Sequence, residues 1–540
     1  MKQWMHSLWM NSAVAGSIRP PLTLFAELTS FFISRMTHDS SNEPDRGIFG
    51  KLKKGIGDTI DTVAETGSRV DFNLFSKSAR IAVVGASRSG KTVLLTSLID
   101  HLRNHDPRRF RLIPATFSSK ETVQVQNYEE LDVSPGMTQF PFSTFRQSLI
   151  QEACWPRKTK DTYQYRLKIY RDDSPVDRIL KAKFSTNLSF LDFPGERIAD
   201  APITSLSFED WSEYMLGNLP SGDDVQRAVN AFLGQMQSKD SSGDSLIAAY
   251  KAILAVRLMQ FHTAISPSSF VLCPSGSTPE RSMSQQELVE QRIVGLAKDS
   301  QFCPLDERTR LSRPELLSVF KARYAAYKEQ LILPLYKALA ASDHLCILVN
   351  IPEILQSGPA AYNDHVELLQ QVVGFCSPKR NAYLDVLKRV TKFVGKVIID
   401  DAFRPGGIEK AAFVATQADR IRPQDVNRLR KLVDDLRRNC TRALPHIGIE
   451  MESFTCVAVQ ATKPAEGDQL HGRLMSGPAK PGSEEPTVEA YKVSALPGEW
   501  PAGWNPDDYV FPDVWPKFNQ NKNIPPQQIG LDRIFNYLIS

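Results

Sequence analysis

Residues 80–102 constrain the fold of this chain more than any other stretch. The apolar run IAVV at 81–84 predicts a short buried β-strand, which ends where Gly85 opens the turn GASRSGKT. The residues after this turn place leucine and isoleucine at three- and four-residue spacing, as in an amphipathic helix. A strand, a glycine-rich loop and a helix in this order predict an α/β fold with a phosphate-binding loop, called the P-loop below.

The P-loop, residues 85–92, fits the pattern G-x-x-x-x-G-K-[ST] at every required position. Glycines let backbone N–H groups curl around phosphates, and the helix N-terminus favours anions. We expect Lys91 to reach the β- and γ-phosphates and Thr92 to offer its hydroxyl to Mg²⁺. A chance glycine-rich turn is the alternative, but the flanking strand and helix favour a nucleotide site. The residues expected at the nucleotide phosphates are Gly85, Ser87, Arg88, Ser89, Gly90, Lys91 and Thr92.

The composition bounds the class of protein. A chain of 540 residues with 42% hydrophobic content is long enough for several globular domains. Its net charge of +4 indicates no nucleic-acid partner. Seven cysteines without a C-x-x-C pair argue against a disulfide framework or a zinc ribbon and favour a reducing, cytoplasmic setting. No stretch approaches the roughly eighteen apolar residues of a membrane-spanning helix.

The first 78 residues are expected to lie outside the nucleotide domain. Residues 1–45 read as a disordered arm or an extension from an upstream start codon. Residues 46–78 begin with an amphipathic helix over 46–66, which carries lysines at 51, 53 and 54. Such a helix is able to dock on a protein partner or on the inner face of the membrane; packing against its own domain is the alternative.

Two strands are expected before the next motif. Residues 165–170 alternate in polarity, a charged turn follows, and residues 188–193 form a second strand-like run, so the pair predicts a hairpin. The second run ends in LDFPGE, where Asp192 is placed to hold Mg²⁺ through water and Gly195 to offer its N–H to a γ-phosphate. Ras-type enzymes have glutamine where this chain has Glu196, a carboxylate that can orient water but also repels the γ-phosphate.

The rest of the nucleotide domain is interrupted. Residues 205–340 show helical periodicity and predict an all-helical insertion. The sheet resumes at 344–351 and 411–415, so the nucleotide-binding domain is expected to comprise residues 79–204 and 341–465. The fold class expected is therefore α/β: a Ras-like, P-loop mixed sheet flanked by helices, with a large helical insertion.

The strand at 411–415 leads into TQAD, where the nucleotide base would be read. An aspartate accepts hydrogen bonds from N1–H and the N2 amino group of guanine, which adenine does not offer, and Asp419 fits that role. Gln417 stands where guanine-binding motifs have lysine, and Asp419 capping the next helix is the alternative. A further strand at 454–460 leads to Ala461 and Thr462, where a backbone N–H would meet guanine O6.

The C-terminal part divides into two segments. Residues 466–486 are rich in glycine, proline and serine and predict a linker. Residues 487–540 contain three tryptophans, several prolines and a final amphipathic helix, and they predict a strap and a helix docked on the nucleotide domain.

Several strings outside the generic nucleotide motifs support a resemblance. They are SRSGKT (87–92), WP (155–156), FPGE (193–196), RYAAYK (323–328), SGPAAYND (357–364), ATQAD (415–419), VQAT (459–462) and LDR (531–533). In this order, over roughly residues 50–540, the chain resembles the YcjX-like family of P-loop NTPases. The resemblance implies a bacterial cytosolic nucleotide-binding protein of the stress-response type, GTPase-like in its core, with an added helical domain.

The motifs together favour a slow, Mg²⁺-dependent GTP-hydrolysing switch that binds GTP and GDP. Lys91, Gly195 and Glu196 are the residues expected to act on the γ-phosphate. The alternatives are an ATPase coupled to the helical insertion, or a nucleotide-binding scaffold with little hydrolysis. In the scaffold, partners would bind the helical insertion or residues 46–66.

Overall fold

The computed structural model describes the greater part of the chain after residue 75. The described residues are 76–86, 88–112, 124–156, 162–172, 184–220, 223–238, 240–259, 266–268, 298–377, 407–442, 444, 448–475, 488–517 and 521–540. The chain divides into two units, residues 1–74 and 75–540, and all the described residues belong to the second. The predicted arm at 1–45 and the amphipathic helix at 46–66 lie outside the described residues; residues 76–78, predicted to belong to the N-terminal segment, begin a strand.

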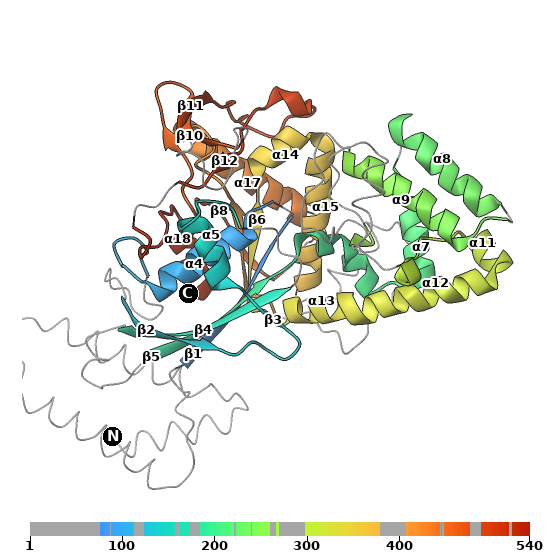
Figure 1. The fold of residues 1–540 in the computed structure, drawn as a ribbon, viewed down its shortest axis with the longest axis horizontal. Helices are drawn as coiled ribbons and strands as arrows, with labels where there is room; N and C mark the ends of the chain where they lie inside the picture. Colours follow the sequence, from blue (N-terminus) through green and yellow to red (C-terminus); the bar gives the residue numbers. More distant parts are fainter. Residues whose placement is uncertain are drawn as a thin grey trace, which may run out of the picture. The chain divides into compact units, whose positions relative to one another are not determined.

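A mixed, mostly parallel β-sheet forms the centre of this unit (Figure 1). The strands run in the order β2-β4-β5-β1-β6-β7-β8, and β3 pairs with β4. Their bounds are β1 (Ser76–Gly85), β2 (Gln124–Leu131), β3 (Thr138–Gln139), β4 (Tyr163–Asp172), β5 (Phe184–Asp192), β6 (His344–Val349), β7 (Lys410–Ala415) and β8 (Glu450–Thr455). Both the α/β class and the predicted hairpin are confirmed, since β4 and β5 pair antiparallel while β1, β5, β6, β7 and β8 pair in parallel.

Both faces of the sheet are covered, and the alternation along β1 shows how. Ile81 and Val83 belong to a hydrophobic cluster with helices α4 (Lys91–Arg103), α5 (Phe142–Ile150) and α18 (Leu531–Ile539). Ala82 and Val84 belong to a second cluster, which includes the helices that follow β5 and β6. Successive side chains of a strand point to opposite faces, so a continuous apolar run is the pattern of a strand buried on both sides.

The helices between β5 and β6 share the second cluster with the sheet. Trp211, Phe302 and Tyr324 are buried there at aromatic-ring distances, together with Ala82 and Val84 of β1. Whether these helices form a separate inserted domain stays a prediction. The described helices in this stretch are η2 (Gly195–Thr204), α7 (Phe208–Gly217), α8 (Asp223–Gln237), α9 (Gly243–Met259), η4 (Lys298–Ser300), α11 (Glu307–Ser312), α12 (Pro314–Tyr327), the π-helical η5 (Lys328–Ile332) and α13 (Leu333–Ala340).

A second, smaller sheet lies in the C-terminal part of the chain. Strand β10 (Gln469–Leu474) pairs antiparallel with β9 (Lys463–Pro464), β11 (Glu489–Lys492) and β12 (Val514–Trp515). The stretch predicted as a linker at 466–486 therefore contains a strand. The sequence did not reveal this strand, because the stretch has the composition of a linker. The other described helices after β6 are α14 (Ile351–Ser357), α15 (Pro359–Cys376), η6 (Pro423–Asp425), α17 (Val426–Thr441) and η7 (Pro506–Asp508).

The strand predicted at 454–460 differs in its bounds. Strand β8 ends at Thr455, and the chain then leaves the ladder of β7. Val457 exchanges two backbone hydrogen bonds of 2.9 Å with Ile529, and Gln460 N–H donates to Gln527 O at 2.9 Å. The C-terminal segment thus replaces the sheet as the partner of residues 457–460.

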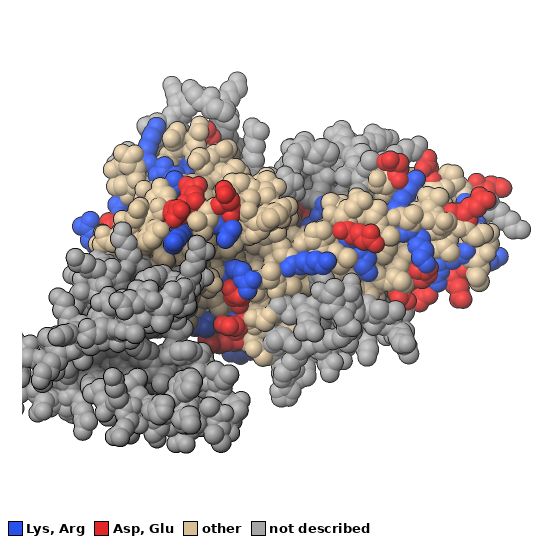
Figure 2. Space-filling model, turned by 90° about the horizontal axis from the view of Figure 1, so that it is seen from below, with Lys and Arg blue, Asp and Glu red and all other residues tan. Residues whose placement is uncertain are grey.

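Charges of both signs are interleaved on the face shown in Figure 2. On the helices after β5, Lys321 pairs with Glu209 and Arg310 with Glu213, each at 2.8 Å. Among the helices of the described residues, none has both the length and the apolar character that a membrane span requires.

The attachment of the C-terminal segment to α4 leads to a pH prediction. His101 is buried, its Nε2 lies 3.0 Å from Pro526 O, and burial lowers its pKa to about 4. The unfolded chain binds a proton near pH 6.5, so stability should fall as the pH drops from 6.5 toward 4, by about 2 kcal/mol at pH 5 from this group. His101→Gln should lose less stability than the wild type between pH 7 and pH 5 in denaturant unfolding. Parallel pH profiles of the two proteins would contradict this assignment.

Candidate nucleotide-binding site

The carboxyl ends of the parallel strands gather the predicted residues at one edge of the sheet. Strand β1 runs into the P-loop, β5 ends at Asp192, and β7 leads into residues 416–419. Val83 of β1 is in register with Asp192, and Gly85 is in register with Leu348 of β6. Ligands of open α/β sheets bind outside this edge, so the predicted residues lie where such a fold places its ligand.

The P-loop has the backbone that its glycines and its lysine predict. Gly90 has φ 88° and Arg88 has φ 62°, and α4 begins directly afterwards at Lys91. Lys91 Nζ donates to Gly85 O and Ala86 O, both at 2.9 Å, so the ammonium lies inside the loop. The buried hydroxyl of Ser89 has no hydrogen-bond partner among the described residues, while Ser87 lies outside them. Lys91 is thus held within the loop in which a phosphate would bind.

Thr92 and Asp192, the two residues predicted for Mg²⁺, lie together. Thr92 Oγ1 donates to Asp192 Oδ2 at 3.3 Å, and Asp192 Oδ1 is buried without a hydrogen bond from any described residue. Burial raises the pKa of Asp192 to about 6, against the opposing effect of Lys91 and Thr92. A hydroxyl and a carboxylate are hard oxygen ligands of the kind Mg²⁺ takes alongside phosphates and water, so the pair fits this ion. The described residues contain no group of three or more His, Cys, Asp and Glu that would hold a metal alone.

Gly195 lies directly against the P-loop. A Cβ atom at this position would lie 2.8 Å from the backbone carbon of Ala86 and 2.9 Å from Lys91 Nζ, and still closer to Gly85 O. Helix η2 begins at this glycine, and its Glu196 is near enough that its charge raises the pKa of Asp192. The residues predicted to act on the γ-phosphate are therefore brought together beside Lys91.

Three of the four residues predicted at the base meet, with a different hydrogen-bond pattern from the one expected. Asp419 Oδ2 accepts from Ala461 N–H at 2.6 Å and Thr462 N–H at 3.1 Å, and Thr462 Oγ1 donates to Asp419 O. The Ala461 N–H expected to meet guanine O6 thus donates to Asp419 in this structure. The helix-cap alternative for Asp419 is wrong, because η6 is preceded by Arg422 and α17 by Asp425. Burial raises the pKa of Asp419, against the effect of these backbone donors.

Three side chains at the strand ends hold the P-loop from outside, and we predicted none of these contacts. Thr416 Oγ1 donates to Ser89 O at 2.9 Å, while the side-chain amides of Asn350 and Gln417 both donate to Arg88 O at 3.4 Å. Asn350 follows β6 directly and also accepts from Glu353 N–H at the start of α14. Its position after a buried strand next to the P-loop strand is the signal that could have identified it.

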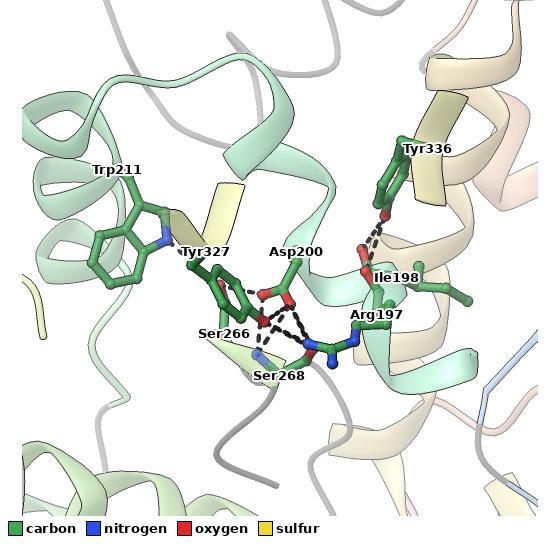
Figure 3. A network of polar contacts seen from close by, with 8 residues as sticks. All are labelled: Arg197, Ile198, Asp200, Trp211, Ser266, Ser268, Tyr327 and Tyr336. Atoms are coloured by element: carbon green, nitrogen blue, oxygen red, sulfur yellow. Dashed lines mark hydrogen bonds and ion pairs between the residues drawn. The ribbon is translucent and has the colours of Figure 1, made fainter. Parts of the chain in front are cut away.

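A buried polar network joins η2 to the helices that follow (Figure 3). Asp200 is fully buried and accepts from Tyr327 OH at 2.6 Å, Ser268 Oγ at 2.5 Å and Ser266 Oγ at 2.8 Å. Arg197 Nη1 lies 4.0 Å from Asp200 Oδ2 and donates to Tyr327 OH at 2.7 Å. A buried carboxylate with this many donors is stable only while all its partners stay in place. The network therefore ties the segment after Gly195 to the end of α12.

A second contact joins η2 to α13. Tyr336 OH donates to the backbone oxygens of Arg197 and Ile198 at 3.0 and 3.2 Å. No motif pointed to Asp200 or Arg197, and Tyr327 entered only through the string RYAAYK.

The sequence profile of the YcjX-like family, DUF463, matches residues 79–540. The chain therefore belongs to the YcjX-like family. The predicted membership is confirmed.

Two YcjX-like relatives carry a name that describes an activity. The "Ras-like GTPase YcjX" of Escherichia coli K12 is 24% identical over 481 residues, which cover 85% of this chain and 95% of that protein. The protein of the same name from Shewanella oneidensis is 22% identical over 495 residues, covering 85% of this chain and 93% of the relative. Both alignments cover most of this chain and nearly all of the relative.

The Asp200 network predicts a ranking of stabilities. Asp200→Ala leaves several buried hydroxyl groups without their acceptor and Arg197 without its ion-pair partner. It should cost about 3–5 kcal/mol of unfolding free energy. Tyr327→Phe removes one donor and should cost about 1–2 kcal/mol. Denaturant unfolding of both variants and the wild type measures the difference. An Asp200→Ala variant as stable as Tyr327→Phe would show that the carboxylate does not organise the network.

Proposed function

We propose that this chain binds guanine nucleotides with Mg²⁺ and hydrolyses GTP slowly as a molecular switch. One observation carries the proposal: the P-loop, the Thr92–Asp192 pair and Asp419 lie at the same edge of one sheet, after β1, β5 and β7. This spacing along the edge separates a phosphate end from a base end, as a bound nucleoside triphosphate requires. The names of the two relatives support it.

At the phosphate end, each residue has a defined task. Lys91, now bonded to Gly85 O and Ala86 O, would exchange one or both of these carbonyls for phosphate oxygens. Thr92 and Asp192 would hold Mg²⁺, which supplies charge neutralisation at the phosphates when bound. The raised pKa of Asp192 means that a bound cation would also stabilise its ionised form.

At the base end, Asp419 is the residue that distinguishes guanine from adenine. Its Oδ2 is occupied by two backbone N–H groups, which fix the plane of the carboxylate. Guanine N1–H and N2–H₂ are donors that match a carboxylate, whereas adenine N1 is an acceptor and would be repelled. An ATPase is the alternative, because Gln417 stands where the guanine motif has lysine and offers no charge to the base.

The switching element in this proposal is the segment that starts at Gly195. Its backbone is in contact with the P-loop, and five residues later Asp200 fastens it to Tyr327 and Ser268. A γ-phosphate that repositions Gly195 would therefore shift the residues of this network and the helices between β5 and β6. We assign these helices to the inserted domain of a Ras-like fold, as the output of the switch.

The rate of hydrolysis follows from Glu196. A carboxylate beside Asp192 can accept a proton from the attacking water, but its charge adds to that of the γ-phosphate. We therefore propose slow intrinsic turnover that a partner accelerates.

The base assignment is tested by Asp419→Asn. An amide offers a donor where the carboxylate accepted, so affinity should move from guanine toward xanthine nucleotides, with GDP binding weakened by about 100-fold. Titration of fluorescent GDP, xanthosine diphosphate and ADP analogues measures this change. An unchanged order of the three nucleotides would overturn the guanine assignment.

The phosphate assignment is tested by Gly195→Ala. The added methyl group would overlap the P-loop backbone at residues 85 and 86, so η2 must move away from the site. We expect single-turnover GTP hydrolysis to slow by about tenfold or more, while GDP affinity changes by less than about threefold. Lys91→Ala is the matched comparison, because it should abolish binding of both nucleotides. A normal rate of GTP hydrolysis by Gly195→Ala would show that this glycine has no role in the reaction.

A further inference from the structure

Arg420 connects the base end of the site to a distant part of the chain. Its side chain is 9% exposed, and its Nη1 donates to Gln417 Oε1. Its Nη2 donates to Phe511 O at 2.7 Å, Pro512 O at 3.1 Å and Asp513 Oδ1 at 2.9 Å. One guanidinium therefore joins the TQAD loop to residues 511–513, more than ninety positions later in the sequence.

The contact with Gln417 fixes the orientation of its side-chain amide. Gln417 has φ 56°, which is uncommon for a residue with a side chain and requires support from its surroundings. Since Arg420 donates to its Oε1, the amide nitrogen points the other way and donates to Arg88 O in the P-loop. The two hydrogen bonds thereby fix the position of the aliphatic part of Gln417 next to Asp419 in the sequence.

The guanidinium also acts on Asp419 through its charge. Burial raises the pKa of the Asp419 carboxyl group, and the positive charge of Arg420 opposes this effect. A lysine at position 417 would bring a positive charge to this loop. In this chain Arg420, three residues later, supplies that charge.

We propose that Arg420 is a positioning residue of the base site: it holds Gln417 between the P-loop and the base, and residues 511–513 hold Arg420. This inference rests on the proposed function, since it assigns a base to the site beside Gln417 and Asp419. The C-terminal segment is then part of nucleotide recognition, and purine affinity depends on the Arg420–Asp513 ion pair. Arginine is required here because the guanidinium donates hydrogen bonds from several nitrogen atoms, whereas a lysine donates from one.

The test separates base binding from phosphate binding in the full-length protein. Affinities for fluorescent Mg·GDP are measured by titration, and those for magnesium tripolyphosphate, which has no base, by competition. Arg420→Lys should weaken Mg·GDP by about tenfold and change tripolyphosphate binding by less than about twofold. The side chain of Asp513 is 59% exposed, so we expect Asp513→Ala to fold like the wild type. This variant should weaken Mg·GDP binding by about threefold and leave tripolyphosphate affinity unchanged.

Two comparisons show whether Arg420 acts through Gln417. Gln417→Ala combined with Arg420→Lys should bind Mg·GDP no more weakly than Gln417→Ala alone, because the second change then has nothing left to position. Arg422→Lys is the matched control, because Arg422 lies in the same loop and its guanidinium donates to Asp425 and Asp468 instead of Gln417. Its variant should bind both ligands like the wild type.

Equal weakening of Mg·GDP and tripolyphosphate by Arg420→Lys would overturn the inference, as would full additivity with Gln417→Ala or unchanged Mg·GDP affinity of Asp513→Ala. The proposed function fails in a different experiment. If the wild type binds Mg·ADP as tightly as Mg·GDP, the guanine assignment falls, while the difference between a purine nucleotide and tripolyphosphate still decides the role of Arg420.

Discussion

The parallel pairing of β1 with β5 on one side and β6 on the other is the constraint on which the rest depends. It sets Val83 level with Asp192 and Gly85 level with Leu348, so three strand ends reach one edge of the sheet together. Residues that lie one hundred positions apart meet there, as Thr92 and Asp192 do at 3.3 Å. The continuous apolar sequences of β1 and β6 make this pairing possible, because both faces of the sheet are covered by helices.

The P-loop is preorganised by contacts made behind it. A loop that turns its N–H groups toward phosphates turns carbonyl groups away from them, and those carbonyls need donors. Lys91 donates to Gly85 O and Ala86 O. Thr416 donates to Ser89 O, and the side-chain amides of Asn350 and Gln417 donate to Arg88 O. The donors that follow β6 and β7 thereby make the shape of the phosphate site depend on the strand ends where the base is proposed to bind.

How far the sequence predicted these features depends on the range of each interaction. The P-loop, the hairpin β4–β5 and the α/β class follow from local patterns of residue type, and the structure agrees with them. The bounds of the strand at 450–455 and the Asp419–Ala461 contact were misjudged or missed, because they depend on segments far along the chain, such as residues 527–529. The strand at 469–474 was missed because it lies in a stretch with the composition of a linker. Buried polar contacts such as Asp200–Tyr327 have no periodic signature, since a single carboxylate in a helix does not reveal its partners.

The central claim is that this edge of the sheet is a guanine-nucleotide site, and competition binding to the wild-type protein tests it most directly. A fluorescent GDP analogue bound in the presence of Mg²⁺ is displaced by unlabelled GTP, GDP, ATP or ADP. The account predicts that GTP and GDP compete at least about tenfold better than ATP and ADP, since only guanine satisfies Asp419. Displacement by ATP and ADP at equal or lower concentrations would contradict it.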